Sequence, residues 1–178
     1  MKVGITGAQS VGKTTLLNAL RSEKKFKTYA ICDEVTRELI KLGLDINEAG
    51  SDLTQELIMQ KHVFNVFMYN DMLTDRTALD GLVYTTYLHL HGKVTKDTLD
   101  RVKAIYDKII HEYDFIFYIP PEFKIVDDGV RSIDPDFRDE IVELFEGYIT
   151  EMPREIIRVS GSVRERLDQI MKVITWKN

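Results

Sequence analysis

A glycine-rich loop near the N-terminus constrains the fold of this chain more than any other feature. Residues 7–14 read Gly-Ala-Gln-Ser-Val-Gly-Lys-Thr, a complete match to G-x-x-x-x-G-K-[ST]. The run Lys2 to Thr6 before the loop predicts a buried strand, and the segment Lys13 to Arg21 predicts a helix. A strand before this pattern and a helix after it form the context in which such a loop holds phosphate groups. The sequence therefore predicts a phosphate-binding loop, the alternative being a coincidental surface loop.

The residue types in this loop suit a nucleotide. Glycines let the backbone turn so tightly that several N–H groups point into one cavity, and the helix start adds the positive end of its dipole. Lys13 is expected to reach the β- and γ-phosphates of ATP, and the Thr14 hydroxyl to coordinate Mg²⁺. The residues expected here to bind the nucleotide are Gly7, Ala8, Gln9, Ser10, Val11, Gly12, Lys13, Thr14 and Thr15.

Short apolar runs alternate with amphipathic stretches along the rest of the chain. Further strands are predicted at residues 29–32, 71–76, 115–119 and 156–159. Helices are predicted around residues 39–42, 51–69, 99–110, 137–148 and 163–174. Strands separated by helices indicate parallel pairing with right-handed crossovers. We therefore expect an α/β fold: a three-layer P-loop NTPase domain over residues 1–178, around a five-stranded parallel sheet.

One of these helices has two interpretations. Ser51 and Asp52 can cap a long helix that ends near Tyr69. Its apolar side chains are mainly expected in the core, the alternative being a helix that covers an acceptor pocket; they are Leu53, Leu57, Ile58, Phe64 and Phe67.

The composition of the chain excludes several classes of function. The 24 Lys and Arg against 29 Asp and Glu give a net charge of −5, which argues against holding a long nucleic acid mainly by its phosphates, though a local basic patch stays open. A single cysteine, Cys32, excludes an intramolecular disulfide and a multi-cysteine zinc site. No signal peptide fits the first residues, and the longest apolar runs are too short for a bilayer, so we expect a cytoplasmic protein without membrane insertion.

Two large classes of P-loop protein are excluded. The chain lacks the D-x-x-G and N/T-K-x-D motifs of GTPases; residues 95–98, Thr-Lys-Asp-Thr, come close but lack the final acid. It is also too short for an ordinary AAA+ module with its lid domain. Small P-loop kinases and their non-catalytic relatives remain.

Acidic residues follow the second predicted strand. Ligands of open α/β sheets bind outside the carboxyl ends of the strands, so Asp33 or Glu34 is placed to accept the proton of an attacking hydroxyl. The alternative is that the pair caps the next helix. Arg37 either joins this acceptor site or lies on the surface.

The third predicted strand ends at Asp75 and Arg76. Asp75 is expected to hold a Mg²⁺-bound water or the acceptor hydroxyl, and Arg76 to grip an anionic group of the acceptor. A structural ion pair at a helix start is the alternative.

The turn-rich segment from Pro121 to Arg138 is expected to form a short lid. Arg131 and Arg138 within it would neutralise charge on the transferred phosphoryl group, unless the segment is a solvated loop. Gly161, after the last strand, either borders the adenine or begins the closing helix. The four histidines show no ligand-like spacing, so no metal site is expected from them.

Several blocks together resemble a known group: small P-loop proteins related to the nicotinamide riboside kinase domain of bacterial NadR, a group commonly labelled an AAA-type domain although it is kinase-like. The blocks are Gly7–Thr14, Asp33–Glu38, Asp75–Asp80, Asp127–Arg131 and Val159–Gly161. Asp75-Arg76 also resembles an element of thymidylate and deoxynucleoside kinases, and the acid after the second strand resembles the hydroxyl-activating acid of deoxynucleoside kinases. The resemblance implies ATP- and Mg²⁺-dependent phosphoryl transfer to a nucleoside or nucleotide.

The leading hypothesis is thus a small-molecule kinase. The catalytic residues expected are Lys13, Asp33, Glu34 and Arg131. The acceptor residues expected are Asp33, Arg37, Asp75 and Arg76, with Thr14 and Asp75 for the metal. A nucleotide-dependent binding switch and a kinase acting on a nucleic-acid hydroxyl are the alternatives, and a homodimer is left open.

Overall fold

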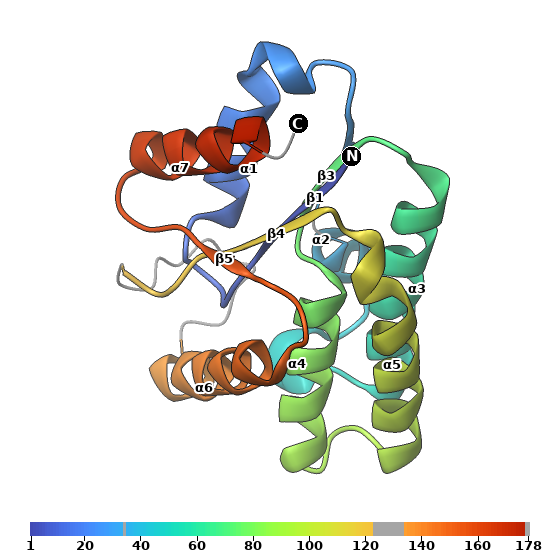
Figure 1. Ribbon diagram of the computed structural model, residues 1–178. Coiled ribbons are helices and arrows are strands. Elements are labelled where there is room, and N and C mark those ends of the chain that lie inside the picture. The colour runs from blue at the N-terminus through green and yellow to red at the C-terminus, as the bar shows by residue number, and fades with distance from the viewer. Residues whose placement is uncertain (34, 123–133, 177–178) are drawn as a thin grey trace.

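The computed structural model describes residues 1–33, 35–122 and 134–176 and builds them around one parallel sheet (Figure 1). Its five strands lie in the order β2-β3-β1-β4-β5. They are β1 (Lys2–Thr6), β2 (Ala30–Cys32), β3 (Met72–Asp75), β4 (Phe115–Tyr118) and β5 (Ile157–Arg158). All four pairings are parallel, as the alternation of strands and helices predicted.

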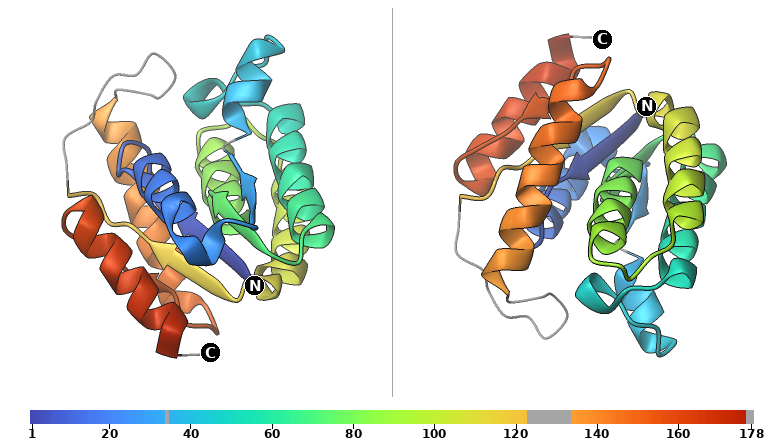
Figure 2. Two further views of the ribbon diagram at one scale, coloured as in Figure 1. Left: turned by 90° about the horizontal axis from the view of Figure 1, so that it is seen from above. Right: turned by 90° about the horizontal axis from the view of Figure 1, so that it is seen from below.

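Helices cover both faces of the sheet and make three layers (Figures 1 and 2). On one face α1 (Lys13–Ser22) packs against α7 (Val163–Trp176). The other face carries α3 (Asp52–Met68), α4 (Ala78–Leu90), α5 (Lys96–Ile109) and α6 (Pro135–Glu151), with α4 in contact with the other three. The short α2 (Thr36–Lys41) follows β2. The predicted three-layer α/β fold is confirmed.

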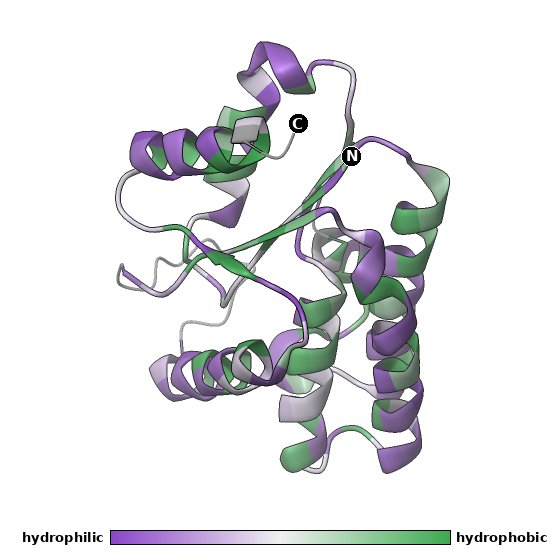
Figure 3. Cartoon of the chain, viewed as in Figure 1, coloured by the Kyte–Doolittle hydropathy of each residue, from purple (hydrophilic) through white to green (hydrophobic). Residues whose placement is uncertain are grey.

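The sheet core and its register bring the functional loops together. Figure 3 shows the hydrophobic residues of the central strands, and Val3 and Ile5 of β1 are fully buried. Ile5 lies opposite Asp75 of β3 and Thr6 opposite Tyr118 of β4. The chain continues from β1 to strands on one side and later to strands on the other, so a ligand crevice is expected at the carboxyl end of β1.

Helix α4 was not among the sequence predictions. Ten of its thirteen residues are buried, so its sequence has no polar face and therefore no helical periodicity. Its start is nevertheless well specified. The Thr77 side chain accepts from the N–H of Leu79, and the Asp80 carboxylate accepts from the N–H of Thr77, which forms a capping box.

Helix α3 corrects one expectation. Its start is as predicted, because the Ser51 hydroxyl accepts from the N–H of Thr54 over 3.4 Å. The prediction that its apolar side chains enter the core is wrong for Leu53, Phe64 and Phe67, which are 54, 50 and 67% exposed. The helix turns polar side chains inward instead, among them Gln55 and His62, so that its buried side borders a pocket.

Within the part of the chain that the structure describes, no helix is both long enough and apolar enough to cross a bilayer.

Candidate functional site

The glycine-rich loop connects β1 to α1 and has the backbone that its sequence predicts. Gly7 has a φ of +141°, and a Cβ there would lie 2.6 Å from the carbonyl oxygen of Ile119, so a side chain does not fit. Gly12 has a φ of +92° and is the N-cap of α1. Ser10 adopts a positive φ of +60° without being a glycine. This strain is the kind found where backbone is shaped around a ligand.

Lys13 lies over the loop. Its Nζ donates to the carbonyl oxygens of Gly7 at 2.7 Å and Ala8 at 2.6 Å, and the residue is only 4% exposed. The ammonium group therefore already sits at the cavity that the loop encloses. Thr15, which we also expected at the nucleotide, is exposed on the first turn of α1.

Asp75 and Thr14 meet across two neighbouring strands. The Thr14 hydroxyl donates to Oδ2 of Asp75 over 2.5 Å, because the parallel register places the end of β3 beside the loop. Mg²⁺ prefers oxygen ligands and is commonly held by one or two carboxylates together with phosphates and waters. The hydroxyl and the carboxylate supply that donor chemistry at the right end of the sheet, so the pair fits the predicted metal.

Arg76 is held in a strained conformation at the end of β3. Its φ is +82°, and its N–H donates to the carbonyl oxygen of Ile5. Its guanidinium lies 3.5 Å from Oδ1 of Asp80 and stacks 4.9 Å from the ring centre of Tyr84. The predicted alternative, an ion pair at a helix start, is thus present in the structure. The residue nevertheless also lines a pocket.

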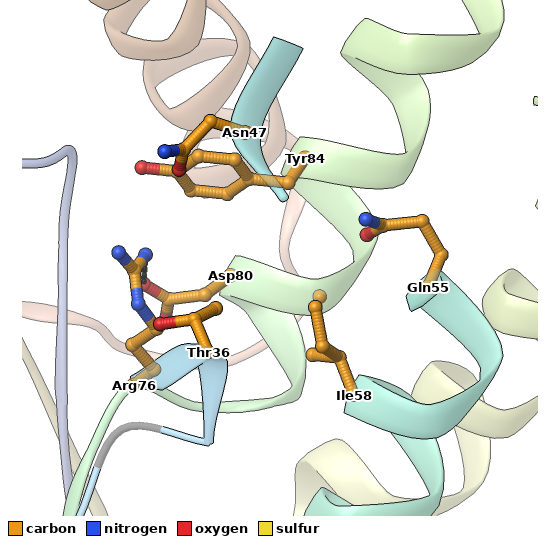
Figure 4. A pocket seen from close by; sticks show the side chains of 8 residues that line it. Thr36, Asn47, Gln55, Ile58, Arg76, Asp80 and Tyr84 are labelled. Atoms are coloured by element: carbon orange, nitrogen blue, oxygen red, sulfur yellow. Dashed lines mark hydrogen bonds and ion pairs between the residues drawn. The ribbon is translucent and has the colours of Figure 1, made fainter. Parts of the chain in front are cut away.

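That pocket lies between α2, α3 and α4, with Arg76 at one end of it (Figure 4). The enclosed space is about 20 Å³, room for about one water molecule, and it continues into open solvent. It is lined by Thr36, Asn47, Gln55, Ile58, Arg76, Asp80, Gly81 and Tyr84. The sequence analysis named Arg76 as an acceptor residue, and it indicated Thr36 and Asp80 only as members of the blocks Asp33–Glu38 and Asp75–Asp80. The other lining residues were missed as site residues.

Asp80 connects three neighbouring groups at the end of β1 and the start of α4. Its carboxylate accepts from the Thr6 hydroxyl at 2.6 Å and from the Thr77 N–H at 2.8 Å, besides pairing with Arg76. It is 1% exposed. Asp80 therefore fixes the position of Arg76 between the loop and the pocket.

The acid predicted after β2 lies at the same edge of the sheet. Cys32 pairs with Thr74, so Asp33 and Asp75 each follow a matched pair of strand residues. Asp33 is exposed and thus accessible to a substrate. Glu34 and the side chain of Arg37 lie outside the described part of the structure.

A network that the sequence did not predict supports the loop from α7. Arg166 is 2% exposed; it donates from Nη1 to the carbonyl oxygen of Val11 and from Nη2 to the Glu122 carboxylate. Glu122 also accepts from the N–H of Gly161, which has a φ of +89°. These bonds, with that from Arg166 the stronger, lower the pKa of the Glu122 carboxyl below its ordinary value. Gly161 is therefore tied to the base of the loop.

The predicted lid is only partly described. Arg131 and most of the segment 121–138 lie outside the described residues. Arg138 corrects the prediction, because it belongs to the first turn of α6 rather than to a loop. It is 7% exposed, since α6 begins at Pro135 after the N-cap Asp134.

A comparison of the sequence with protein-family models identifies the family of this chain. The family model described as "AAA domain" matches residues 2–166. The chain belongs to this AAA domain family. The match contains β1, the glycine-rich loop and the Asp75–Arg76 element, so the AAA domain provides a nucleotide-binding P-loop. No curated protein gives a significant match.

Solved structures share the fold of this AAA domain. NadR in complex with NR superposes with a TM-score of 0.71 at 19% identity, covering 97% of this chain and 50% of NadR. Deoxyadenosine kinase from M. mycoides, with dCMP and dCDP bound, gives 0.70 at 16% identity and 98% and 99% coverage. YorR from Bacillus subtilis, in complex with phosphorylated GDP, gives 0.64 at 18% identity and 99% and 97% coverage. The chain spans half the length of NadR, and at these identities the likeness establishes the P-loop kinase-like fold.

Proposed function

We propose that this chain is an ATP- and Mg²⁺-dependent kinase that phosphorylates a hydroxyl or phosphate of a small nucleoside or nucleoside monophosphate. The observation that carries the proposal is the position of two consecutive residues. Asp75 bonds to Thr14 of the nucleotide-binding loop, whereas Arg76 lines a separate pocket. A donor site and an acceptor site therefore adjoin at the end of β3, as group transfer requires.

Each of the groups at this edge of the sheet has a role in the proposed reaction. An acceptor oxygen forms a bond to the γ-phosphorus while the bond from phosphorus to the β–γ bridging oxygen breaks, and ADP leaves. The proton of a hydroxyl acceptor passes to the Asp33 carboxylate; a phosphate acceptor attacks as the anion. Lys13 and Arg76 supply positive charge near the transferred group. Thr14 and Asp75 would hold Mg²⁺, which supplies charge neutralisation on the phosphates when bound.

The remaining assignments extend this proposal beyond the described residues. Glu34 is the second candidate for the proton acceptor, and Arg37 a second cation for the acceptor. Arg131 would close over the phosphates, with Arg138 supporting it from α6. The named ligands of the structural neighbours, namely NR, dCMP, dCDP and GDP, support a nucleoside or nucleotide acceptor.

The proposal is tested by transfer of radiolabelled γ-phosphate from ATP with Mg²⁺. The acceptor panel contains ribo- and deoxyribonucleosides, their monophosphates, nicotinamide riboside and short DNA. We expect one small acceptor to be labelled well above the rest. Lys13→Ala should abolish this labelling while the variant stays folded, whereas Lys24→Ala, in a short 3₁₀ turn away from the site, should retain it.

Each alternative has its own outcome. Labelling of DNA alone, with steep salt dependence, would favour a nucleic-acid kinase over a small-molecule kinase. ATP binding without labelling of any acceptor would contradict the kinase proposal and favour a nucleotide-dependent switch.

A further inference from the structure

The Gln9 side chain links the glycine-rich loop to a residue that lines the pocket. It is 2% exposed, and its Oε1 accepts a hydrogen bond from the Tyr84 hydroxyl at 3.0 Å. Tyr84 in turn lines the pocket and stacks against Arg76. The carboxamide of Gln9 thus lies where the phosphate-binding loop meets the pocket.

The other end of this carboxamide has no partner in the described part of the chain. Its Nε2 is buried and makes no hydrogen bond to any described residue. Because Tyr84 occupies Oε1, the Nε2 end is left to donate to something else. Leaving such a buried donor unpaired is destabilising, so a native protein retains one where a ligand or water satisfies it.

A second unpaired group belongs to a residue that lines the pocket itself. Thr36, the first residue of α2, is 8% exposed, and its Oγ1 likewise has no hydrogen-bond partner among the described residues. Figure 4 shows this hydroxyl beside Arg76 and Asp80 at one end of the pocket. Thr36 therefore leaves a polar group unsatisfied on the pocket wall, and Gln9 leaves one beside Tyr84, a residue of the same wall.

The chemistry of the two groups indicates the ligand. An amide N–H₂ donates only, and a threonine hydroxyl both donates and accepts. Neutral hydroxyl groups of a ligand satisfy both. An anionic group of a ligand would instead bind to the positively charged side chains of Lys13 and Arg76. The part of an acceptor nearest the loop is the part that carries the reacting oxygen, which in a nucleoside is the sugar.

We propose that Gln9 and Thr36 bind the hydroxyl groups of the acceptor's sugar, so that the site selects a ribose over a sugar lacking one of these hydroxyls. This inference rests on the proposed function for the location of the acceptor. It makes Gln9 a specificity-determining residue in addition to a nucleotide-loop residue. A site built around a substrate hydroxyl rejects an analogue without it, because its own buried groups are then left unpaired.

The test measures binding rather than turnover. Calorimetry would compare ribonucleosides with their 2′-deoxy and 3′-deoxy analogues, each in the presence of a non-hydrolysable ATP analogue and Mg²⁺. The wild type should bind a ribonucleoside about 10-fold more tightly than at least one deoxy analogue. In Gln9→Met or Thr36→Val this ratio should fall towards one, whereas Gln60→Met, an exposed glutamine on α3, should keep it.

Several results would overturn the inference: equal binding of ribose and deoxyribose forms by the wild type, no nucleoside binding at all, or an equal loss for every analogue in the variants. Weaker binding of the ATP analogue by Gln9→Met, with nucleosides unaffected, would assign Gln9 to the nucleotide alone. The transfer assay separates the two proposals. Hydroxyl-dependent binding without transfer rejects the kinase only, and transfer without hydroxyl dependence rejects this inference only.

Discussion

The Arg166 guanidinium on α7 donates to the carbonyl oxygen of Val11 over 2.7 Å, although the two residues are 155 positions apart. The same guanidinium bonds to Glu122, which follows β4. The loop that holds phosphate is thus fixed from outside by the last helix of the domain.

Replacing this arginine should weaken nucleotide binding through the loop. Arg166→Met removes the bonds to Val11 and Glu122, and we expect ATP affinity to fall about 10-fold and the free energy of unfolding by about 1–3 kcal/mol. Titration with ATP and urea denaturation measure the two effects. Arg164→Met on the same helix removes only an exposed pair with Asp168 and should change stability by less than about 1 kcal/mol. Wild-type ATP affinity in Arg166→Met would contradict a role in shaping the loop.

Asp75 should control the metal dependence of nucleotide binding. Asp75→Asn keeps the size of the side chain but removes the charge beside Thr14. We expect ATP binding to lose most of its enhancement by Mg²⁺ while binding without Mg²⁺ changes little, as measured by titration with and without the metal. Asp71→Asn, at the exposed position just before β3, is the matched control. An unchanged Mg²⁺ effect in Asp75→Asn would remove this carboxylate from the metal site.

Asp33 should matter for turnover more than for nucleotide affinity. We expect Asp33→Asn to lower kcat by about 10²–10⁴-fold with a hydroxyl acceptor, the range of general-base contributions, and to leave ATP affinity within about 3-fold. Asp45→Asn, farther along the same connection, serves as the control. If Asp33→Asn turns over normally, Glu34 becomes the candidate, and Glu34→Gln repeats the test.

His62 should make the protein less stable in mild acid. It is 4% exposed in α3 and has no hydrogen-bond partner among the described residues. The charged side chains that interact with it electrostatically are Asp80 and Arg76. Burial lowers its pKa to about 4. The unfolded chain, with an ordinary histidine pKa near 6.5, therefore binds the proton first, and stability is lost as pH falls from about 6.5 towards 4.

The expected loss from this one residue is about 2 kcal/mol at pH 5 relative to pH 8. Urea denaturation at the two pH values measures it, and His62→Leu should reduce the difference by that amount. His111→Gln, an exposed histidine, should leave the difference unchanged. The same pH dependence in His62→Leu as in the wild type would show that other groups cause it.

The sequence determined the P-loop and the sheet because both are local. The pattern from Gly7 to Thr14 contains the two glycines whose positive φ the turn requires. The sequence alone therefore predicts the backbone conformation of the loop. Strands such as β1 and β4 are buried on both faces and form short apolar runs between breakers. The alternation with helices then leaves parallel pairing as the expected arrangement.

Only the tertiary structure decided which side chains face the pocket. Helix α4 has no periodicity because it is buried nearly all round, and α3 buries the polar residues Gln55 and His62 while Phe64 and Phe67 are exposed. A prediction from hydrophobic periodicity assumes that the apolar face of a helix points into the core. This assumption fails where a helix lines a polar cavity. The contacts of Arg166 with Val11 and of Gln9 with Tyr84 join residues far apart in the chain. Such contacts depend on how helices pack across the sheet, which local spacing does not encode.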